Sequence, residues 1–223
     1  MSATSPPPRL AILISGRGSN MLAILRACRA GTLRADPAIV IADRADAAGL
    51  ESARELGVET AALQPRGRSG AALEPALAAA LDASRADVIA LAGFMRILSG
   101  ALVERYLGRM LNIHPSLLPA YRGLHTHRRV LAACDTEHGA SVHFVTPELD
   151  AGPVVLQSKV AVLPGDTEAT LAARVLATEH VIYPRVLGWL ADGRLSFRSG
   201  APWLDGQRLT TPIVEDFRAS VVR

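Results

Sequence analysis

The sequence is poor in cysteine and has no pattern that targets a chain to a membrane or an oxidising compartment. Its two cysteines, Cys28 and Cys134, form no CxxC pair, and two unpaired thiols fit a reducing cytosol. The start of the chain is polar and rich in proline, unlike a secretory leader. No apolar run approaches the roughly 18 residues of a membrane span. We therefore expect a cytoplasmic protein without a membrane partner, in which both thiols are packing residues.

Aromatic residues and lysine are also scarce. Aromatic residues make up 4% of the chain, so alanine, valine, leucine and isoleucine must fill the core. The apolar fraction of 49% over 223 residues argues against disorder and suits one domain. Lys159 is the only lysine, and the arginines are scattered among acidic residues with a net charge of +3. Because no element carries a basic cluster, we expect no nucleic-acid partner.

Short apolar runs alternate with segments of helical spacing in the first half of the chain. The runs at 38–42 and 87–94 are apolar throughout, which is typical of parallel strands covered on both faces. The runs after residue 140 alternate more, which favours mixed or antiparallel strands. The sequence therefore predicts an α/β fold: a Rossmann-like, mostly parallel sheet flanked by helices, with mixed or antiparallel strands in the C-terminal part.

We expect one domain at 9–208, between a disordered tail at 1–8 and a C-terminal tail at 209–223. Capping residues at 166–168 open a helix that is expected to end at Tyr183, because Pro184 follows. A second helix is expected at 186–192, and short strands and turns follow from 195. Further strands are expected at 9–15, 58–62, 110–114, 140–145 and 154–163, and further helices at 21–30, 50–56, 71–83 and 102–106.

Sheets of this kind bind ligands at the carboxyl ends of their strands, near the point where the strand order reverses. That rule directs attention first to the SGRGSN stretch at 15–20, between a strand and a helix. Its glycines allow backbone amides to approach an anion at the helix N-terminus, which favours a phosphate site. An ordinary turn with a helix cap is the alternative. A dinucleotide site is supported by Asp43 but disfavoured because Met21 stands where the third glycine of GxGxxG belongs.

The second such stretch is NIHPSLLP at 112–119. Residues two apart on a strand face the same side, so Asn112 and His114 are expected to project together. An amide beside an imidazole can stabilise an oxygen that becomes negative. A satisfied polar pair at a strand end is the alternative. Ser116 is a weak nucleophile candidate, since no GxSxG elbow surrounds it.

A carboxylate follows on the loop at 148–153. Asp150 could orient His114, favour its charged form and relay protons through water. The alternative is a turn aspartate. Four further histidines suggest a metal site, but no familiar ligand spacing is present, so we expect no metal; they are His125, His127, His138 and His143.

Five segments together resemble the folate-dependent formyltransferase family, across residues 10–208. They are ISGRGSN, LAGFMRILS, LNIHPSLLPAYRGLHTH, HGASVHFVTPELDAGPV and TEHVIYP. The Asn-x-His and SLLP pattern is typical of the whole family. The GSN loop and GLHTH resemble the branch that formylates glycinamide ribonucleotide in purine biosynthesis, with 10-formyltetrahydrofolate as co-substrate.

The resemblance implies a role for each matching residue. The implied catalytic residues are Asn112, His114 and Asp150, with His143 behind them in a second shell. Phosphate and ribose binding fall to Gly18, Ser19, Asn20 and Glu179, and the folate pocket to Met95, Arg96, Ile97, Leu98, Val145, Thr146 and Leu149. The arginine that meets the folate tail in relatives is replaced by Gly70, with Arg66 and Arg68 as possible substitutes. Pro147 and Ala151 also depart from the family pattern.

The mechanism expected from these residues needs no enzyme nucleophile. The substrate amine, held by the Gly93 carbonyl, attacks the formyl carbon directly. Asn112 and protonated His114 stabilise the resulting oxyanion, and Asp150 relays a proton. The partners are then two small molecules, and the chain acts as a monomer or a homodimer.

Several other functions remain open at this point. Formyltetrahydrofolate hydrolase is the nearest, although those enzymes usually carry a regulatory domain before this unit. A formyltransferase with another amine acceptor, a nicotinamide-dependent dehydrogenase and a non-catalytic binding module are the others. The joint presence of Asn112, His114 and Asp150 argues against the binding module.

Overall fold

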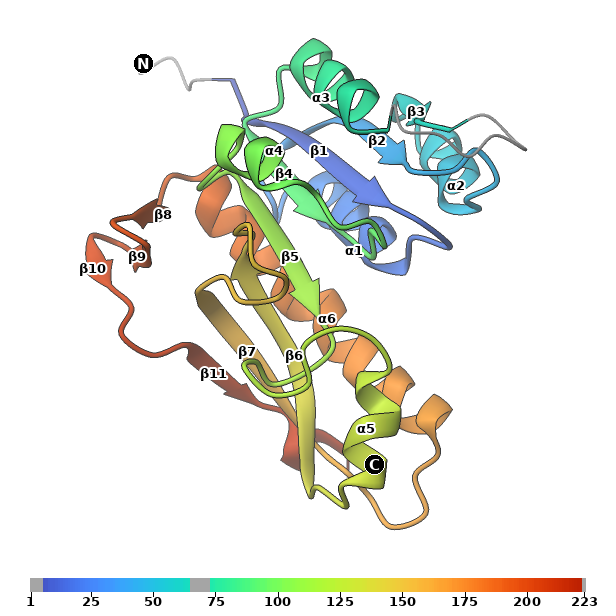
Figure 1. The fold of residues 1–223 in the computed structure, drawn as a ribbon, viewed down its shortest axis with the longest axis vertical. Coiled ribbons are helices and arrows are strands. Elements are labelled where there is room, and N and C mark those ends of the chain that lie inside the picture. Colours follow the sequence, from blue (N-terminus) through green and yellow to red (C-terminus); the bar gives the residue numbers. More distant parts are fainter. Residues whose placement is uncertain (1–5, 65–72, 222–223) are drawn as a thin grey trace.

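A computed structural model describes residues 6–64 and 73–221. An eight-stranded sheet in the order β11-β7-β6-β5-β4-β1-β2-β3 forms its centre, and a small sheet β10-β9-β8 lies beside it (Figure 1). The main strands are β1 (Arg9–Ile14), β2 (Asp36–Ala42), β3 (Thr60–Ala62), β4 (Val88–Leu91), β5 (Met110–His114), β6 (Glu137–Phe144), β7 (Val154–Ala161) and β11 (Ile213–Asp216). The helices are α1 (Ser19–Arg29), α2 (Gly49–Glu55), α3 (Leu73–Ser84), α4 (Gly100–Arg105), α5 (Thr126–Ala132) and α6 (Glu168–Ala191). The small sheet comprises β8 (Leu195–Arg198), β9 (Ala201–Leu204) and β10 (Gln207–Arg208), and a 3-10 turn closes the described chain at Arg218–Val221.

The strand directions confirm the predicted fold class. β1 to β5 run parallel, whereas β6 is antiparallel to both β5 and β7. The chain moves from β1 to β2 and β3 on one side and returns to β4 and β5 on the other. The strand order therefore reverses between β1 and β4, and the loops that follow these two strands meet at the carboxyl edge of the sheet.

Alternate residues of the inner strands pack on opposite faces of the sheet. On β1, Leu10, Ile12 and Ile14 join the core formed with α1 and α6, whereas Ala11 and Leu13 join the core formed with α3 and α4. Figure 1 shows α6 passing behind β5 and β6. Both faces being buried explains why these strands are apolar throughout. Within the described residues, no helix is long and apolar enough to cross a membrane.

The prediction that a helix ends before Pro184 was wrong. α6 continues through Pro184 as one helix from Glu168 to Ala191. An internal proline costs about 3 kcal/mol because it removes one backbone hydrogen bond. Tyr183 and Val186 on either side are fully buried, and each such side chain contributes roughly 1.5–3 kcal/mol. Burial therefore outweighs the proline. The predicted opening is confirmed by a capping box at Thr167.

α5 follows the GLHTH stretch, where no helix was assigned. Short strands were expected from 195 on, and β11 is one of them, although it lies within the segment assigned to a C-terminal tail. β11 pairs parallel with β7 at the edge of the main sheet. Its residues alternate between half-buried and exposed, as in a strand with one face toward solvent.

Candidate active site

The loop after β1 leads directly into α1 and leaves the helix N-terminus open. Gly18, with a φ of 73°, precedes the helix, and no side chain caps it, so the first-turn amides remain available to an anion. The Gly49 amide donates to the Gly16 carbonyl at 3.0 Å and supports the loop from behind. A Cβ at Gly49 would lie 2.6 Å from Ile14 Cδ1 and 3.1 Å from the Gly16 carbonyl oxygen, so a larger residue would have to displace its neighbours. A cavity of about 270 Å³ opens between residues 15–20 and Ala92, Gly93 and Met95.

Asn20 and Glu179 form a buried pair beneath this loop. The Asn20 Nδ2 donates to Glu179 Oε2 at 2.6 Å, across 159 residues of sequence. Burial raises the pKa of Glu179, and the Asn20 hydrogen bond partly offsets that effect. Asn20 Oδ1 is buried without a partner in the described structure. The structure thus brings together two residues that the sequence analysis placed in one binding site.

The segment after β4 is fixed to the same loop. The Gly93 carbonyl accepts from the Ser15 amide at 3.1 Å, and the Met95 amide donates to Ser15 Oγ at 2.8 Å. Arg96 forms an ion pair with Asp43, Nε to Oδ2, at 2.8 Å. Because Asp43 is almost fully buried and engaged by Arg96, it is not presented to a ribose as a dinucleotide site requires.

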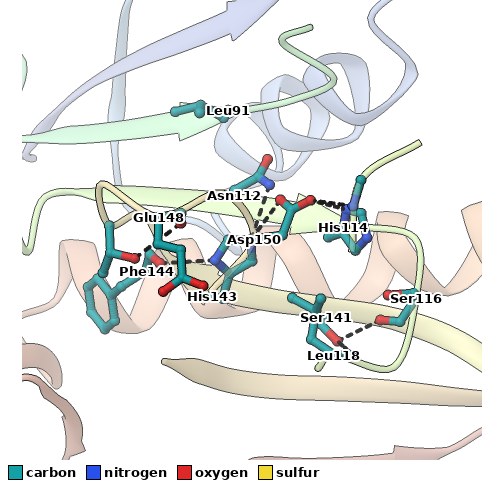
Figure 2. A network of polar contacts seen from close by, with 12 residues as sticks. Leu91, Asn112, His114, Ser116, Leu118, Ser141, His143, Phe144, Glu148 and Asp150 are labelled. Atoms are coloured by element: carbon teal, nitrogen blue, oxygen red, sulfur yellow. Dashed lines mark hydrogen bonds and ion pairs between the residues drawn. The ribbon is translucent and has the colours of Figure 1, made fainter. Parts of the chain in front are cut away.

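Asn112, His114 and Asp150 converge at the end of β5 (Figure 2). Both β5 residues border a cavity of about 750 Å³ that Asp150 also lines. His114 Nδ1 lies 3.4 Å from Asp150 Oδ2, and both side chains are less than a tenth exposed. Two acceptors face the ring, because Nε2 lies 2.9 Å from the Tyr121 carbonyl oxygen. Each ring nitrogen therefore has an acceptor opposite it.

His143 fixes the orientation of the Asn112 amide. It lies directly opposite Asn112 in the β5–β6 ladder, and its Nε2 is 3.1 Å from Asn112 Nδ2. Burial lowers the pKa of His143 to about 4, so the ring is neutral near pH 7. Its Nδ1 donates to the Phe144 carbonyl at 2.9 Å, which leaves Nε2 as an acceptor. Asn112 must therefore direct its NH₂ group toward His143 and retains a second N–H.

The Asp150 loop depends on a close backbone approach. Asp150 has a φ of 48°, and its Oδ2 accepts from the Gly123 amide at 2.9 Å. At Gly152 a Cβ would lie 1.8 Å from the Phe144 carbonyl oxygen, so only glycine lets the loop pack on β6. Gly152, two residues after Asp150, therefore helps to determine where this carboxylate lies.

A smaller, mostly apolar pocket of about 90 Å³ adjoins the three polar residues. Asn112, His143 and Asp150 form part of its wall. All the predicted folate residues except Met95 line it, namely Arg96, Ile97, Leu98, Val145, Thr146 and Leu149. Met95 instead lines the two neighbouring cavities, and its side chain is 65% exposed. The proposed replacements for the folate-tail arginine, Arg66 and Arg68, lie with Gly70 outside the described residues.

The remaining histidines form no metal centre among the residues described. His127 Nδ1 lies 2.9 Å from His138 Nε2, and the two rings meet edge to face. Burial lowers the pKa of His138 to about 4 and also lowers that of His127. His125 occupies the left-handed position before α5. Both His125 and His127 line the large cavity. The His127–His138 pairing and the backbone contacts of Tyr121 and Gly123 could not be predicted, because no local sequence pattern indicates either.

Comparison with known proteins gives consistent matches. Residues 8–187 match a family described as formyl transferase. The phosphoribosylglycinamide formyltransferase of Escherichia coli (strain K12) is 53% identical over 201 residues, covering 90% of this chain and 95% of that protein. A solved structure of the phosphoribosylglycinamide formyltransferase from Coxiella burnetii aligns with a TM-score of 0.88 at 45% identity, over 93% of this chain and 99% of that chain. A formyltetrahydrofolate deformylase from Pseudomonas syringae aligns with a TM-score of 0.82 over 90% of this chain and 66% of that chain, but at 23% identity this likeness concerns the fold alone.

Proposed function

The chain belongs to the formyl transferase family, and from that premise we propose that it formylates 5'-phosphoribosylglycinamide, a step of purine biosynthesis. The formyl group comes from 10-formyltetrahydrofolate, which leaves as tetrahydrofolate. The observation that carries this proposal is the arrangement of the site. An anion-binding loop and an apolar pocket flank one cluster of Asn112, His114 and Asp150. Two substrates bound on either side would meet at that cluster.

The phosphate of the ribonucleotide binds at the open N-terminus of α1. Gly18, Ser19 and Asn20 offer backbone amides there, and the helix dipole favours the negative charge. Glu179, which accepts a hydrogen bond from Asn20, is the proposed ribose ligand. The Gly93 carbonyl, whose second lone pair is free when it accepts from Ser15, holds the amine.

The folate ring system occupies the apolar pocket bordered by residues 96–98 and 145–149. Side chains of Ile97, Leu98, Val145 and Leu149 offer it apolar contacts, and backbone groups of the same segments offer hydrogen bonds. Thr146 also lines this pocket, and Met95, which lines the neighbouring large cavity, is the last residue of the proposed folate-binding set. Asn112 and Asp150 line this pocket too, so the formyl group of a bound folate would lie beside them.

Chemistry proceeds by direct attack of the neutral amine on the formyl carbon. A C–N bond forms, and the carbonyl π electrons move onto oxygen. The second N–H of Asn112 donates to that oxygen, and the His114 cation lies alongside it. One preorganised donor supplies about 3–4 kcal/mol. Collapse then breaks the bond to the folate nitrogen, and holding two substrates in register supplies much of the remaining acceleration.

Asp150 manages the proton that the amine must lose. Its carboxylate stabilises the His114 cation and accepts the amine proton through a water molecule, and the folate nitrogen gains a proton on departure. The partners are these two small molecules, with no nucleic acid. The assembly is a monomer or a homodimer, located in the cytoplasm.

Variants of the proposed catalytic residues test these roles. Asn112→Ala is expected to lower kcat about 100- to 1000-fold, because it removes the oxyanion donor, while the Kd values of both substrates stay within a few fold. His114→Ala is expected to lower kcat similarly. Ser116→Ala is the matched control, since its buried hydroxyl donates to the Ala120 carbonyl and has no proposed role. Full activity in either of the first two variants would contradict the assignment.

A further inference from the structure

Both residues that handle the proton in the proposed function are held by the backbone of one short segment. The Tyr121 carbonyl accepts from His114 Nε2, and the Gly123 amide donates to Asp150 Oδ2, each at 2.9 Å. Neither contact involves a side chain of residues 121–123. The positions of His114 and Asp150 relative to one another therefore depend on where this backbone lies.

The backbone of this segment has an unusual conformation. The φ angle is 56° at Tyr121, 78° at Gly123 and 57° at His125, all in the left-handed region. A bulky residue such as tyrosine rarely adopts that region, and it persists there only where its surroundings hold it. Arg122 and Leu124 are exposed, so the interior does not anchor them. Tyr121 packs partly against the core, so contacts at the surface must fix the exposed remainder of the segment.

Arg129 of α5 makes two such contacts. Its guanidinium carbon lies 5.2 Å from the centroid of the Tyr121 ring, and its Nη1 donates to the Arg122 carbonyl at 2.6 Å. The Tyr121 hydroxyl donates to Asp135 Oδ2 at 2.5 Å, which holds the ring in reach. A planar guanidinium that stacks on a ring and donates to a carbonyl restrains both groups at once.

We propose that Arg129 is a positioning residue for formyl transfer. It holds the backbone of residues 121–123 and so keeps His114 and Asp150 in register. Arg129 is itself exposed and is absent from the described wall of the cavity that His114 and Asp150 line. The proposal rests on the proposed function, because it assigns Arg129 an effect only through those two residues.

The test is steady-state kinetics of Arg129→Ala, with Arg109→Ala as the matched control. Arg109 makes equivalent contacts at the opposite end of β5: its guanidinium carbon lies 5.4 Å from the Tyr106 ring, and it donates to the Asp87 carbonyl at 3.3 Å. Arg129→Ala is expected to lower kcat about tenfold with both KM values within twofold, because misplacement of reacting groups affects turnover. Arg109→Ala is expected to keep the wild-type kcat.

The conservative variant separates positioning from a general loss of structure. Arg129→Lys keeps a cation near the ring and should be intermediate; it also provides the readout if the alanine variant does not fold.

Wild-type kinetics in Arg129→Ala, or equal losses in Arg129→Ala and Arg109→Ala, would overturn the inference while leaving the proposed function standing. An inactive wild-type protein would overturn the proposed function instead.

Discussion

Two buried histidines make the stability of this protein dependent on pH well above the range in which carboxylates titrate. His138 and His143 are 1% and 2% exposed, and burial lowers the pKa of each from 6.5 to about 4. The unfolded chain therefore binds protons at these rings at a pH where the folded chain does not. Stability is complete above pH 6.5 and is lost as the pH falls toward 4.

The size of the effect follows from the pKa values. Each ring costs about 1.4 kcal/mol per pH unit within that window, so the free energy of unfolding falls by about 2 kcal/mol per histidine between pH 7.5 and pH 5. The two together give about 4 kcal/mol, a large share of the roughly 5–15 kcal/mol that stabilises a typical domain. His127, whose pKa is lowered in the same direction, adds to the loss.

His138→Gln isolates one of the two contributions, because an amide does not titrate. The free energy of unfolding would be measured with denaturant at pH 7.5, 6.5, 5.8 and 5. Between pH 7.5 and pH 5 it should fall by about half as much as in the wild type, a difference on the order of 2 kcal/mol. Val160→Ala is the control, since Val160 is fully buried directly opposite His138. It should lower stability by about 1–3 kcal/mol equally at every pH. An unchanged pH dependence in His138→Gln would refute the reasoning.

Two further predictions concern the loop and the long helix. Gly152→Ala should lower kcat about 100-fold in steady-state assays, because its Cβ would meet the Phe144 carbonyl and displace Asp150. Gly188→Ala, whose Cβ would make only an ordinary contact with Leu33 Cδ1 at 3.6 Å, should keep the wild-type kcat, and equal activity of the two variants would refute this role of Gly152. Thr167→Ala should lower the free energy of unfolding by about 1 kcal/mol through loss of the capping box, and no change in the denaturation midpoint would contradict it.

Much of the fold was predictable because burial on both faces of the sheet leaves a direct record in the sequence. The apolar run of β4 and the capping residues of α6 were both recognisable. The two-residue period of a strand also predicted that Asn112 and His114 lie together, and both line the large cavity. The rule that a helix ends before a proline was wrong at Pro184, because the packing of α6 on the sheet outweighs the local cost of the proline.

The remainder of the site depends on pairings between distant segments. Asn112 and His143 are neighbours only because β5 and β6 are antiparallel in one particular register. The contacts of Tyr121 and Gly123 are made by the backbone, so they do not depend on residue type and the sequence does not indicate them. Gly152 was visible as a turn glycine, but the close approach to Phe144 that requires it appears only in three dimensions.

The fate of the formyl carbon tests the central claim most directly. Purified protein would be given 10-formyltetrahydrofolate labelled at the formyl carbon, with and without phosphoribosylglycinamide, and the products followed by NMR. The account predicts that the label appears as a formamide on the ribonucleotide and that no folate is consumed without it. Labelled formate released at the same rate with or without the ribonucleotide would show that water is the acceptor and would contradict the account.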